Sequence, residues 1–83
     1  MSQRYGLNHM QPGQQAYVEE LRTTGSMRRR LQDIGLVRDT KVECLGRSPG
    51  GDPSAYLIRG AVIAIRSADC AGILVRSGEG QWG

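Results

Sequence analysis

The sequence predicts a mainly β fold, a small β-barrel of about five strands with one inserted helix and a short helical turn. Short β-rich runs, separated by turns that contain glycine or proline, recur along the chain. Only one segment has the apolar spacing of a helix longer than a single turn. The chain has 83 residues, too few for a two-layer sandwich, so these runs indicate one small closed or partly open barrel.

Composition excludes several classes of protein. Hydrophobic residues make up 39% of the chain and charged residues 23%, which is typical of an ordered soluble protein. No apolar run approaches the ~20 residues that a membrane span needs, and the first six residues lack the apolar stretch of a signal peptide. We therefore expect a cytoplasmic protein without direct membrane insertion. Its domain should span residues 7–76, between a flexible N-terminus at 1–6 and a flexible tail at 77–83.

The clearest local signal is a helix at Met27–Ile34 with its stop signal attached. Ser26 is the expected N-cap, and apolar residues recur at positions i, i+4 and i+7, which predicts one buried stripe. Gly35 follows where helices commonly end in the left-handed conformation, so we expect a positive φ there. Leu36 should then pack back on Leu31.

The strands are predicted from β-rich runs and from the turns between them. The run Ala61–Ile65 is apolar on both faces, so we expect that strand to be central or covered. The predicted strands are Gln14–Arg22, Thr40–Gly46, Ser54–Arg59, Ala61–Arg66 and Ile73–Val75, with one helical turn at Ser67–Gly72. The predicted buried residues are Val18, Leu31, Ile34, Leu36, Val42, Leu57, Ile63, Ile65 and Ile73.

Three successive arginines, Arg28, Arg29 and Arg30, fall in the first turn of the predicted helix. The macrodipole disfavours cations there, by ~0.3–1 kcal/mol each. Three interpretations remain open: a solvated helix face, contacts with acidic groups of a protein partner, and contacts with nucleic acid. Nucleic acid is disfavoured because few aromatic side chains are available to stack on bases.

Catalytic and metal-binding patterns are absent from the sequence. Cys44 and Cys70 belong to no Cys-x-x-Cys pair, so we expect buried, protonated thiols. His9 is the single histidine, whereas a tight transition-metal site needs about four converging ligands. The loop Gly50–Pro53 is no phosphate cradle, because no helix with Lys and Ser/Thr follows it. Its Asp52 should bond its own backbone. We expect no enzyme, cofactor or metal ligand set.

The order of these segments resembles the FeoA family, small cytoplasmic accessory proteins of bacterial ferrous iron uptake. The resemblance rests on Arg28-Arg-Arg-Leu-x-Asp-Ile-Gly-Leu36, Gly51-Asp-Pro53, a strand ending at Arg59-Gly60 and an apolar strand ending at Ile65-Arg66. It covers about Leu7–Val75 and implies an SH3-like barrel with a helix inserted after the first strand. The sequence Ser48-Pro-Gly-Gly51 departs from relatives, which commonly have a bulkier apolar residue before Gly-Asp-Pro.

The resemblance also implies a function and a partner. We expect a non-catalytic accessory or regulatory module that docks on the membrane ferrous iron permease, whose cytoplasmic part is a G-protein domain. Weak homo-oligomers are a further expectation. The alternatives are a transition-metal-binding, iron-sensing domain that uses His9, Asp52 or a cysteine, and a nucleic-acid-binding barrel. The expected partner-binding residues are Arg28, Arg29, Arg30, Leu36, Asp52, Pro53 and Arg59.

Overall fold

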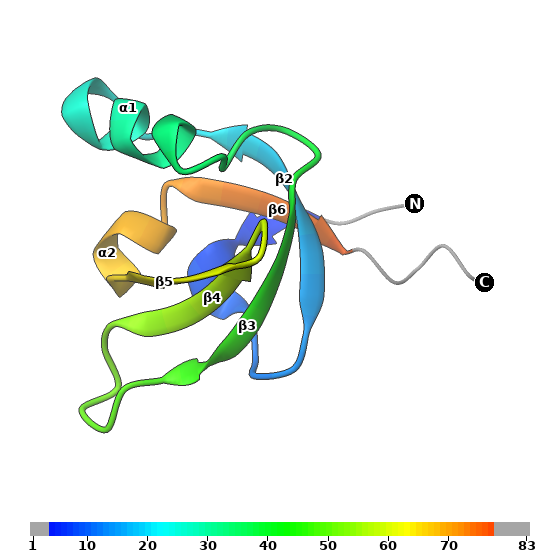
Figure 1. Ribbon diagram of the computed structural model, residues 1–83, viewed down its shortest axis with the longest axis vertical. Helices are drawn as coiled ribbons and strands as arrows, with labels where there is room; N and C mark the ends of the chain where they lie inside the picture. The colour runs from blue at the N-terminus through cyan, green and yellow to red at the C-terminus, as the bar shows by residue number, and fades with distance from the viewer. Residues whose placement is uncertain (1–3, 78–83) are drawn as a thin grey trace.

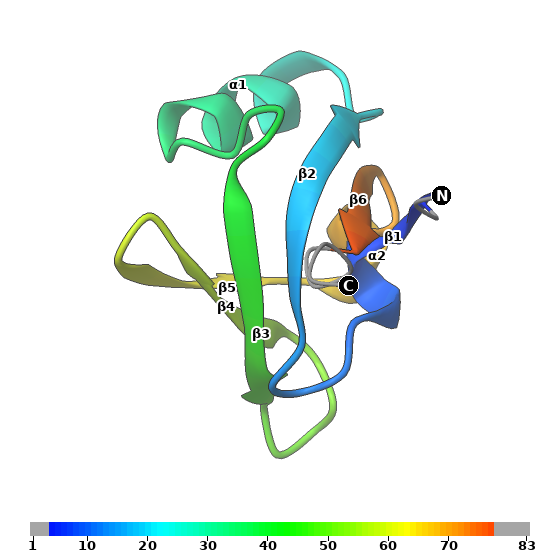
Figure 2. The same ribbon diagram turned by 90° about the vertical axis from the view of Figure 1, so that its right-hand side faces the viewer.

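The computed structural model describes residues 4–77, in which antiparallel strands form one strongly curved sheet, an open barrel (Figures 1 and 2). The sheet has six strands in the order β1-β6-β2-β3-β4-β5. The elements are β1 (Arg4–Gly6), the short helix η1 (Leu7–His9), β2 (Gln15–Leu21), α1 (Gly25–Asp33), β3 (Lys41–Arg47), β4 (Ser54–Ile58), β5 (Ala61–Ile65), α2 (Ser67–Cys70) and β6 (Ile73–Ser77). The mainly β prediction is confirmed.

Strand β1 was not predicted from the sequence. It pairs with β6, with Arg4 opposite Arg76 and Gly6 opposite Leu74. It lies inside the segment 1–6 that we expected to be a flexible N-terminus. Residues 1–3 and 78–83, which make up most of the two predicted flexible ends, lie outside the described residues. No helix within residues 4–77 is long and apolar enough to span a membrane.

Helix α1 begins two residues earlier than the sequence predicted. It runs Gly25–Asp33, and its N-cap is Thr24, whose side chain makes no capping hydrogen bond. The prediction of Ser26 as the N-cap is therefore wrong. Because of this shift, Arg29 and Arg30 leave the first turn, and Arg30 lies in the last turn, where the macrodipole favours a cation.

The predicted end of α1 is confirmed. Gly35 has a φ of +93°. The Leu36 amide donates to the Leu31 carbonyl at 2.9 Å, and the Gly35 amide donates to the Gln32 carbonyl at 3.0 Å. These two bonds are those of a Schellman cap, which needs a left-handed residue at the position of Gly35. Thr40 then fixes the corner that leads to β3, because its hydroxyl donates to the Gly35 carbonyl at 3.0 Å.

Strands β4 and β5 form the predicted hairpin around Arg59-Gly60. Both turn residues have positive φ, +52° and +85°, as the common two-residue hairpin turn requires. The expectation that β5 is central or covered is wrong. It is the last strand of the sheet, and Val62 is 67% exposed.

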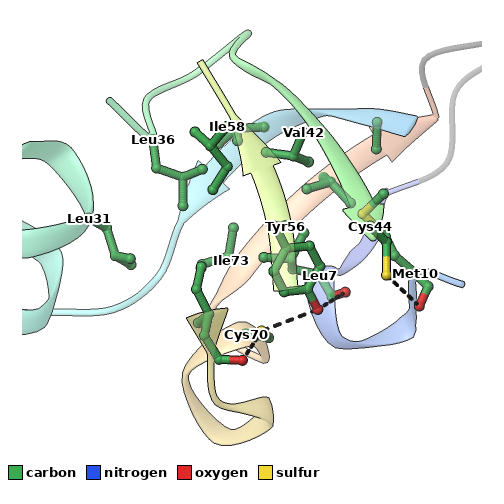
Figure 3. Close-up of a cluster of buried hydrophobic side chains, with 14 residues drawn as sticks. Leu7, Met10, Leu31, Leu36, Val42, Cys44, Tyr56, Ile58, Cys70 and Ile73 are labelled. Carbon is green, nitrogen blue, oxygen red and sulfur yellow. Dashed lines mark hydrogen bonds between the residues drawn. The ribbon is translucent and has the colours of Figure 1, made fainter. Parts of the chain in front are cut away.

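The core lies inside the barrel, between the sheet, α1, η1 and α2 (Figure 3). Six predicted core residues are buried: Val18, Leu31, Leu36, Val42, Ile65 and Ile73. Ile34 and Ile63 are only partly buried against it. Leu57 is also only partly buried, and it lies outside the core cluster. It pairs with Val62 on the face of β4 opposite the buried Tyr56 and Ile58.

Tyr56 and Cys70 connect the hairpin to both short helices at the centre of this core. The Tyr56 hydroxyl donates to the Leu7 carbonyl at 3.4 Å, and the Cys70 thiol lies 3.6 Å from the Tyr56 hydroxyl (Figure 3). Burial raises the pKa of the Tyr56 hydroxyl and of the Cys70 thiol. Both cysteines are buried and free of disulfides, as predicted.

Candidate protein-docking site

A shallow apolar groove of about 120 Å³ lies between α1 and the edge strand β5. We call it the α1–β5 groove. Its apolar walls come from the exposed side of the α1 stripe and from the side chains of β5, and charged residues stand at its rim. The lining residues are Met27, Arg30, Leu31, Ile34, Pro53, Ile63, Ala64, Ile65, Arg66 and Asp69.

The apolar stripe of α1 is wider than the core can cover. Leu31, in its middle, is 2% exposed, whereas Met27 and Ile34 on either side are only partly buried against the core. From the other wall, Ile63 is also partly buried. The groove therefore leaves apolar surface from both elements in contact with water.

The three successive arginines have different surroundings. Arg28 donates a hydrogen bond to the Leu21 carbonyl at 2.8 Å, so it provides a partner for the last carbonyl of β2. Arg29 and Arg30 are exposed, and within residues 4–77 no hydrogen bond or ion pair joins either to another side chain. Only Arg30 lines the groove.

Arg59 and the end of α1 are in direct contact. A Cβ atom placed at Gly35 would collide with Cδ of Arg59, so the aliphatic stem of Arg59 lies over the glycine. This contact joins the β4–β5 turn to the helix cap. Leu36, the next residue, is completely buried, and its side chain packs in the core rather than lying at the surface.

Asp52 fixes the loop at the far end of the groove. One of its carboxylate oxygens accepts a hydrogen bond from the Ser67 amide at 2.8 Å, so the expectation that it bonds its own backbone is wrong. Asp52-Pro53 is a cis peptide, and the Ser48 amide donates to the Pro53 carbonyl at 3.0 Å. The loop is held by these bonds, and Pro53 lines the groove.

The structure thus brings together only some of the residues that the sequence singled out. Arg30 and Pro53 share the groove, Arg59 lies at the helix cap, and Asp52 is used in a structural bond. The sequence analysis missed Ile63, Ala64 and Arg66 as site residues. The sequence feature that could have indicated them is the run Ala61–Ile65, which is apolar on both faces and which we interpreted as a central or covered strand.

A second groove, of about 410 Å³, lies on the outer face of the sheet. Two acidic and two basic side chains line it, so it offers a partner no uniform charge. Its lining residues are Asp39, Thr40, Lys41, Glu43, Leu57, Arg59 and Gly60.

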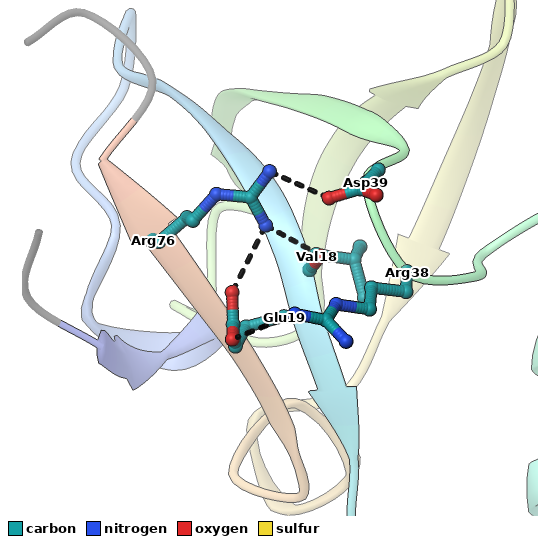
Figure 4. Close-up of polar contacts among 5 residues, drawn as sticks. All are labelled: Val18, Glu19, Arg38, Asp39 and Arg76. Atoms are coloured by element: carbon teal, nitrogen blue, oxygen red, sulfur yellow. Dashed lines mark hydrogen bonds and ion pairs between the residues drawn. The ribbon is translucent and has the colours of Figure 1, made fainter.

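On the β2–β6 side of the barrel, arginines form ion pairs instead (Figure 4). Arg76 contacts Glu19 at 2.9 Å and Asp39 at 2.6 Å, and these bonds raise the pKa of its guanidinium. Arg38 approaches the same Glu19 at 3.6 Å. The Arg76 guanidinium also lies 5.5 Å from the centre of the Tyr17 ring, a cation–π distance.

The described residues do not fit a metal site. Within residues 4–77, no three residues of the types His, Cys, Asp and Glu come together. His9 is exposed, whereas Cys44 and Cys70 are buried. Asp52 is already bonded to Ser67.

Comparison with known proteins identifies relatives. The family model of the FeoA domain matches residues 5–77. The solution structure of the FeoA protein from Chlorobium tepidum is 33% identical, with a TM-score of 0.82 over 92% of this chain and 75% of that one. The FeoA-like protein from Clostridium acetobutylicum is 31% identical, with a TM-score of 0.83 over 93% of this chain and 90% of that one.

A more distant structure describes the fold. FeoA from Stenotrophomonas maltophilia, a prokaryotic SH3 domain protein crystallised with zinc, is 23% identical, with a TM-score of 0.76 over 84% of this chain and 87% of that one. It has been described as a candidate activating factor of ferrous iron transport. The SH3-like fold is thereby confirmed. The search of curated proteins found no match.

Proposed function

Because the chain belongs to the FeoA domain family, we propose that it is a non-catalytic accessory module of ferrous iron uptake, which docks on the cytoplasmic part of the membrane iron permease. The family is associated with ferrous iron transport. In this proposal the protein acts in the cytoplasm, and its partner is the permease rather than the iron itself.

One observation carries the docking proposal: the α1–β5 groove combines apolar side chains with Arg30, a cation that has no carboxylate partner among the described residues. Arg30 is one of the lining residues of the groove, and Arg29 is its neighbour in α1. Arginine suits planar contacts with carboxylates, and burying apolar surface beside them supplies binding energy. A partner with acidic groups around an apolar patch would complement both features.

Binding of the purified chain to the cytoplasmic part of a cognate permease tests the proposal. We expect a dissociation constant of ~100 μM or tighter, a limit typical of weak transient interfaces. Calorimetry or surface plasmon resonance measures it directly. If no binding appears at that concentration, the protein does not dock by this route and the proposal fails.

Two double variants sharpen the test. In Arg29→Glu with Arg30→Glu, the cations beside the groove are reversed, and we expect binding to fall at least about tenfold. The matched control, Arg4→Glu with Arg47→Glu, changes the net charge equally. Arg4 lies on the opposite edge strand, and Arg47 ends β3 at the end remote from α1 (Figure 2). Equal losses in both variants would mean that only net charge matters.

Direct binding of ferrous iron gains no support from residues 4–77, because they bring no ligand set together. Anaerobic calorimetric titration of the purified chain with ferrous ion separates sensing from docking. Heat of binding in this titration, with none in the permease experiment, would favour the iron-sensing alternative instead.

A further inference from the structure

Strand β5 leaves one side of its backbone unpaired. It pairs only with β4, from Ile58 opposite Ala61 to Ser54 opposite Ile65. In a two-residue hairpin the closing pair exchanges both hydrogen bonds, and pairs then alternate along an antiparallel ladder. The amide and carbonyl groups of Val62 and Ala64 therefore point away from β4. Within the part of the chain that the structure describes, no backbone hydrogen bond reaches them from another element.

This edge lacks the protection that proteins usually give to exposed strands. Edges are commonly short, charged, bulged or interrupted by proline. Strand β5 has five residues, all apolar and without proline, and Val62 is 67% exposed. The opposite edge strand, β1, has only three residues, including Arg4. An unprotected apolar edge in a small domain is either an aggregation hazard or a binding site.

The α1–β5 groove runs beside this unpaired edge. A strand added to β5 would form backbone bonds with Val62 and Ala64, and alternate side chains could lie against the groove walls. Ile63 from β5 and Met27 and Ile34 from α1 remain partly exposed there. Backbone bonds for affinity and pockets for alternate side chains are the two elements of peptide recognition by strand addition.

The charges around β5 indicate what the added strand carries. Arg59 precedes the strand in the turn and Arg66 follows its last residue. Arg59 has no carboxylate partner among residues 4–77. Arg66 is 75% exposed at its side chain and approaches Asp69 only at 3.9 Å. Arg30 stands across the groove. A strand with acidic residues at both ends would complement these cations.

We propose that β5 binds an extended segment of a partner protein by strand addition, and that this segment has alternating apolar residues between acidic ends. The proposal deepens the docking function above and rests on it for one point, that the permease carries the segment. The strand-binding property itself belongs to this chain and can be measured without the permease.

A second copy of the chain fits this edge less well. Antiparallel pairing of two β5 strands would place Arg59 of one copy near Arg66 of the other, at both ends of the pair. Like charges that face each other across strands are destabilising. The flanking arginines therefore oppose self-association and favour an acidic segment.

Titration with a synthetic peptide, Asp-Glu-Val-Thr-Val-Thr-Val-Glu-Asp, tests strand addition on the intact chain. Amide NMR spectra should show shifts centred on Val62 and Ala64, with slower hydrogen exchange at both, at peptide concentrations up to ~1 mM. A peptide with Lys in place of each acidic residue should bind at least about tenfold more weakly. The proposal is overturned if β5 shows no shifts, or if both peptides bind equally.

Two further peptides, each N-methylated on one set of alternate residues, separate backbone pairing from side-chain contact. Only one set of amides faces β5 in an added strand, so one peptide should lose about tenfold in affinity and the other much less. Equal affinities would rule out strand addition. This comparison leaves the protein unchanged, so it does not depend on whether a variant folds.

A variant of β5 tests the same backbone pairing by changing the protein instead of the peptide. Val62→Pro removes an outward amide that β4 does not use, whereas Val62→Thr keeps it with a similar shape. We expect about tenfold weaker peptide binding for the first and less than about twofold for the second. Dimerisation of the unmodified chain that Val62→Pro abolishes would identify a second copy as the occupant and overturn the proposal.

The two proposals fail separately. If the peptide binds but the cytoplasmic part of the permease does not, the docking function is wrong and strand addition stands. If the permease fragment binds with equal affinity to Val62→Pro and Val62→Thr, docking stands and strand addition is wrong.

Discussion

Arginines on the β2–β6 side of the barrel are paired with carboxylates, whereas Arg29 and Arg30 beside the α1–β5 groove are not. Arg76 is 26% exposed at its side chain and contacts two acids. The groove arginines are exposed and lack such contacts among the described residues. Arginine therefore forms intramolecular ion pairs on one side of the barrel and remains available to a partner on the other. Variants on the two sides should affect different properties.

The largest expected loss of stability comes from Leu31→Ala, which removes the anchor of the groove side. Leu31 is 2% exposed in the core beneath α1, so its truncation should lower the free energy of unfolding by ~2–5 kcal/mol. Denaturant unfolding measures this loss. Ile34→Ala, from the partly exposed side of the same stripe, is the control and should lose less. A loss below ~1 kcal/mol for Leu31→Ala would mean that α1 is only loosely held.

Gly35→Val should come next, with a loss of at least ~1–2 kcal/mol. The residue has a φ of +93° and a new Cβ would collide with the stem of Arg59. Gly13→Val is the matched control: its φ is +90°, but nothing lies within 4 Å of its Cβ position. The difference between the two variants in unfolding experiments isolates the Arg59 contact. Equal losses would mean that backbone strain alone destabilises both variants and that the Arg59 contact contributes nothing.

Arg76→Gln tests the paired side and should lower the melting temperature by a smaller amount. Loss of the guanidinium leaves Glu19 and Asp39 without their common partner. The difference from the unmodified protein should shrink as salt is added, because salt screens charges at a partly exposed site. A difference that does not change with salt would show that packing on Tyr17, rather than charge, is what Arg76 contributes.

The smallest effect on stability is expected for Arg29→Gln with Arg30→Gln. Neither side chain has a polar partner among residues 4–77, so the free energy of unfolding should change by less than ~0.5 kcal/mol. Thermal melts of this double variant and of Arg76→Gln, measured under the same conditions, compare the two losses of stability directly. If this pair destabilises the fold as much as Arg76→Gln does, the distinction between the two sides is wrong.

Local features of the fold could be predicted from the sequence, and features set by pairing between distant segments could not. The α1 cap followed from Gly35 and its neighbours alone, because a left-handed cap is determined within one turn. The Arg59-Gly60 turn was predictable for the same reason. Asp52, by contrast, bonds an amide in α2, 15 residues away, and no local pattern indicates that partner.

The error at β5 and the outward position of Leu57 both depend on strand pairing that the sequence does not show. An apolar run on both faces is usually buried, so the sequence predicted a covered strand, although an edge strand reserved for a partner has the same composition. For Leu57, side chains alternate along β4, and the choice of inward face depends on the register with β3. The site was therefore missed because β5 pairs with a strand on one side only, and the sequence contains no direct sign of that.

The Arg59–Gly35 contact has a consequence for the affinity of any segment that enters the α1–β5 groove. It holds the β4–β5 turn against α1, while the Asp52–Ser67 bond holds the loop at the other end. Both walls are thus positioned before binding, and little ordering of this chain opposes association. The entropy loss falls mainly on the incoming segment. At equal charge and hydrophobicity, a stiff segment rich in β-branched residues should bind more tightly than a glycine-rich one.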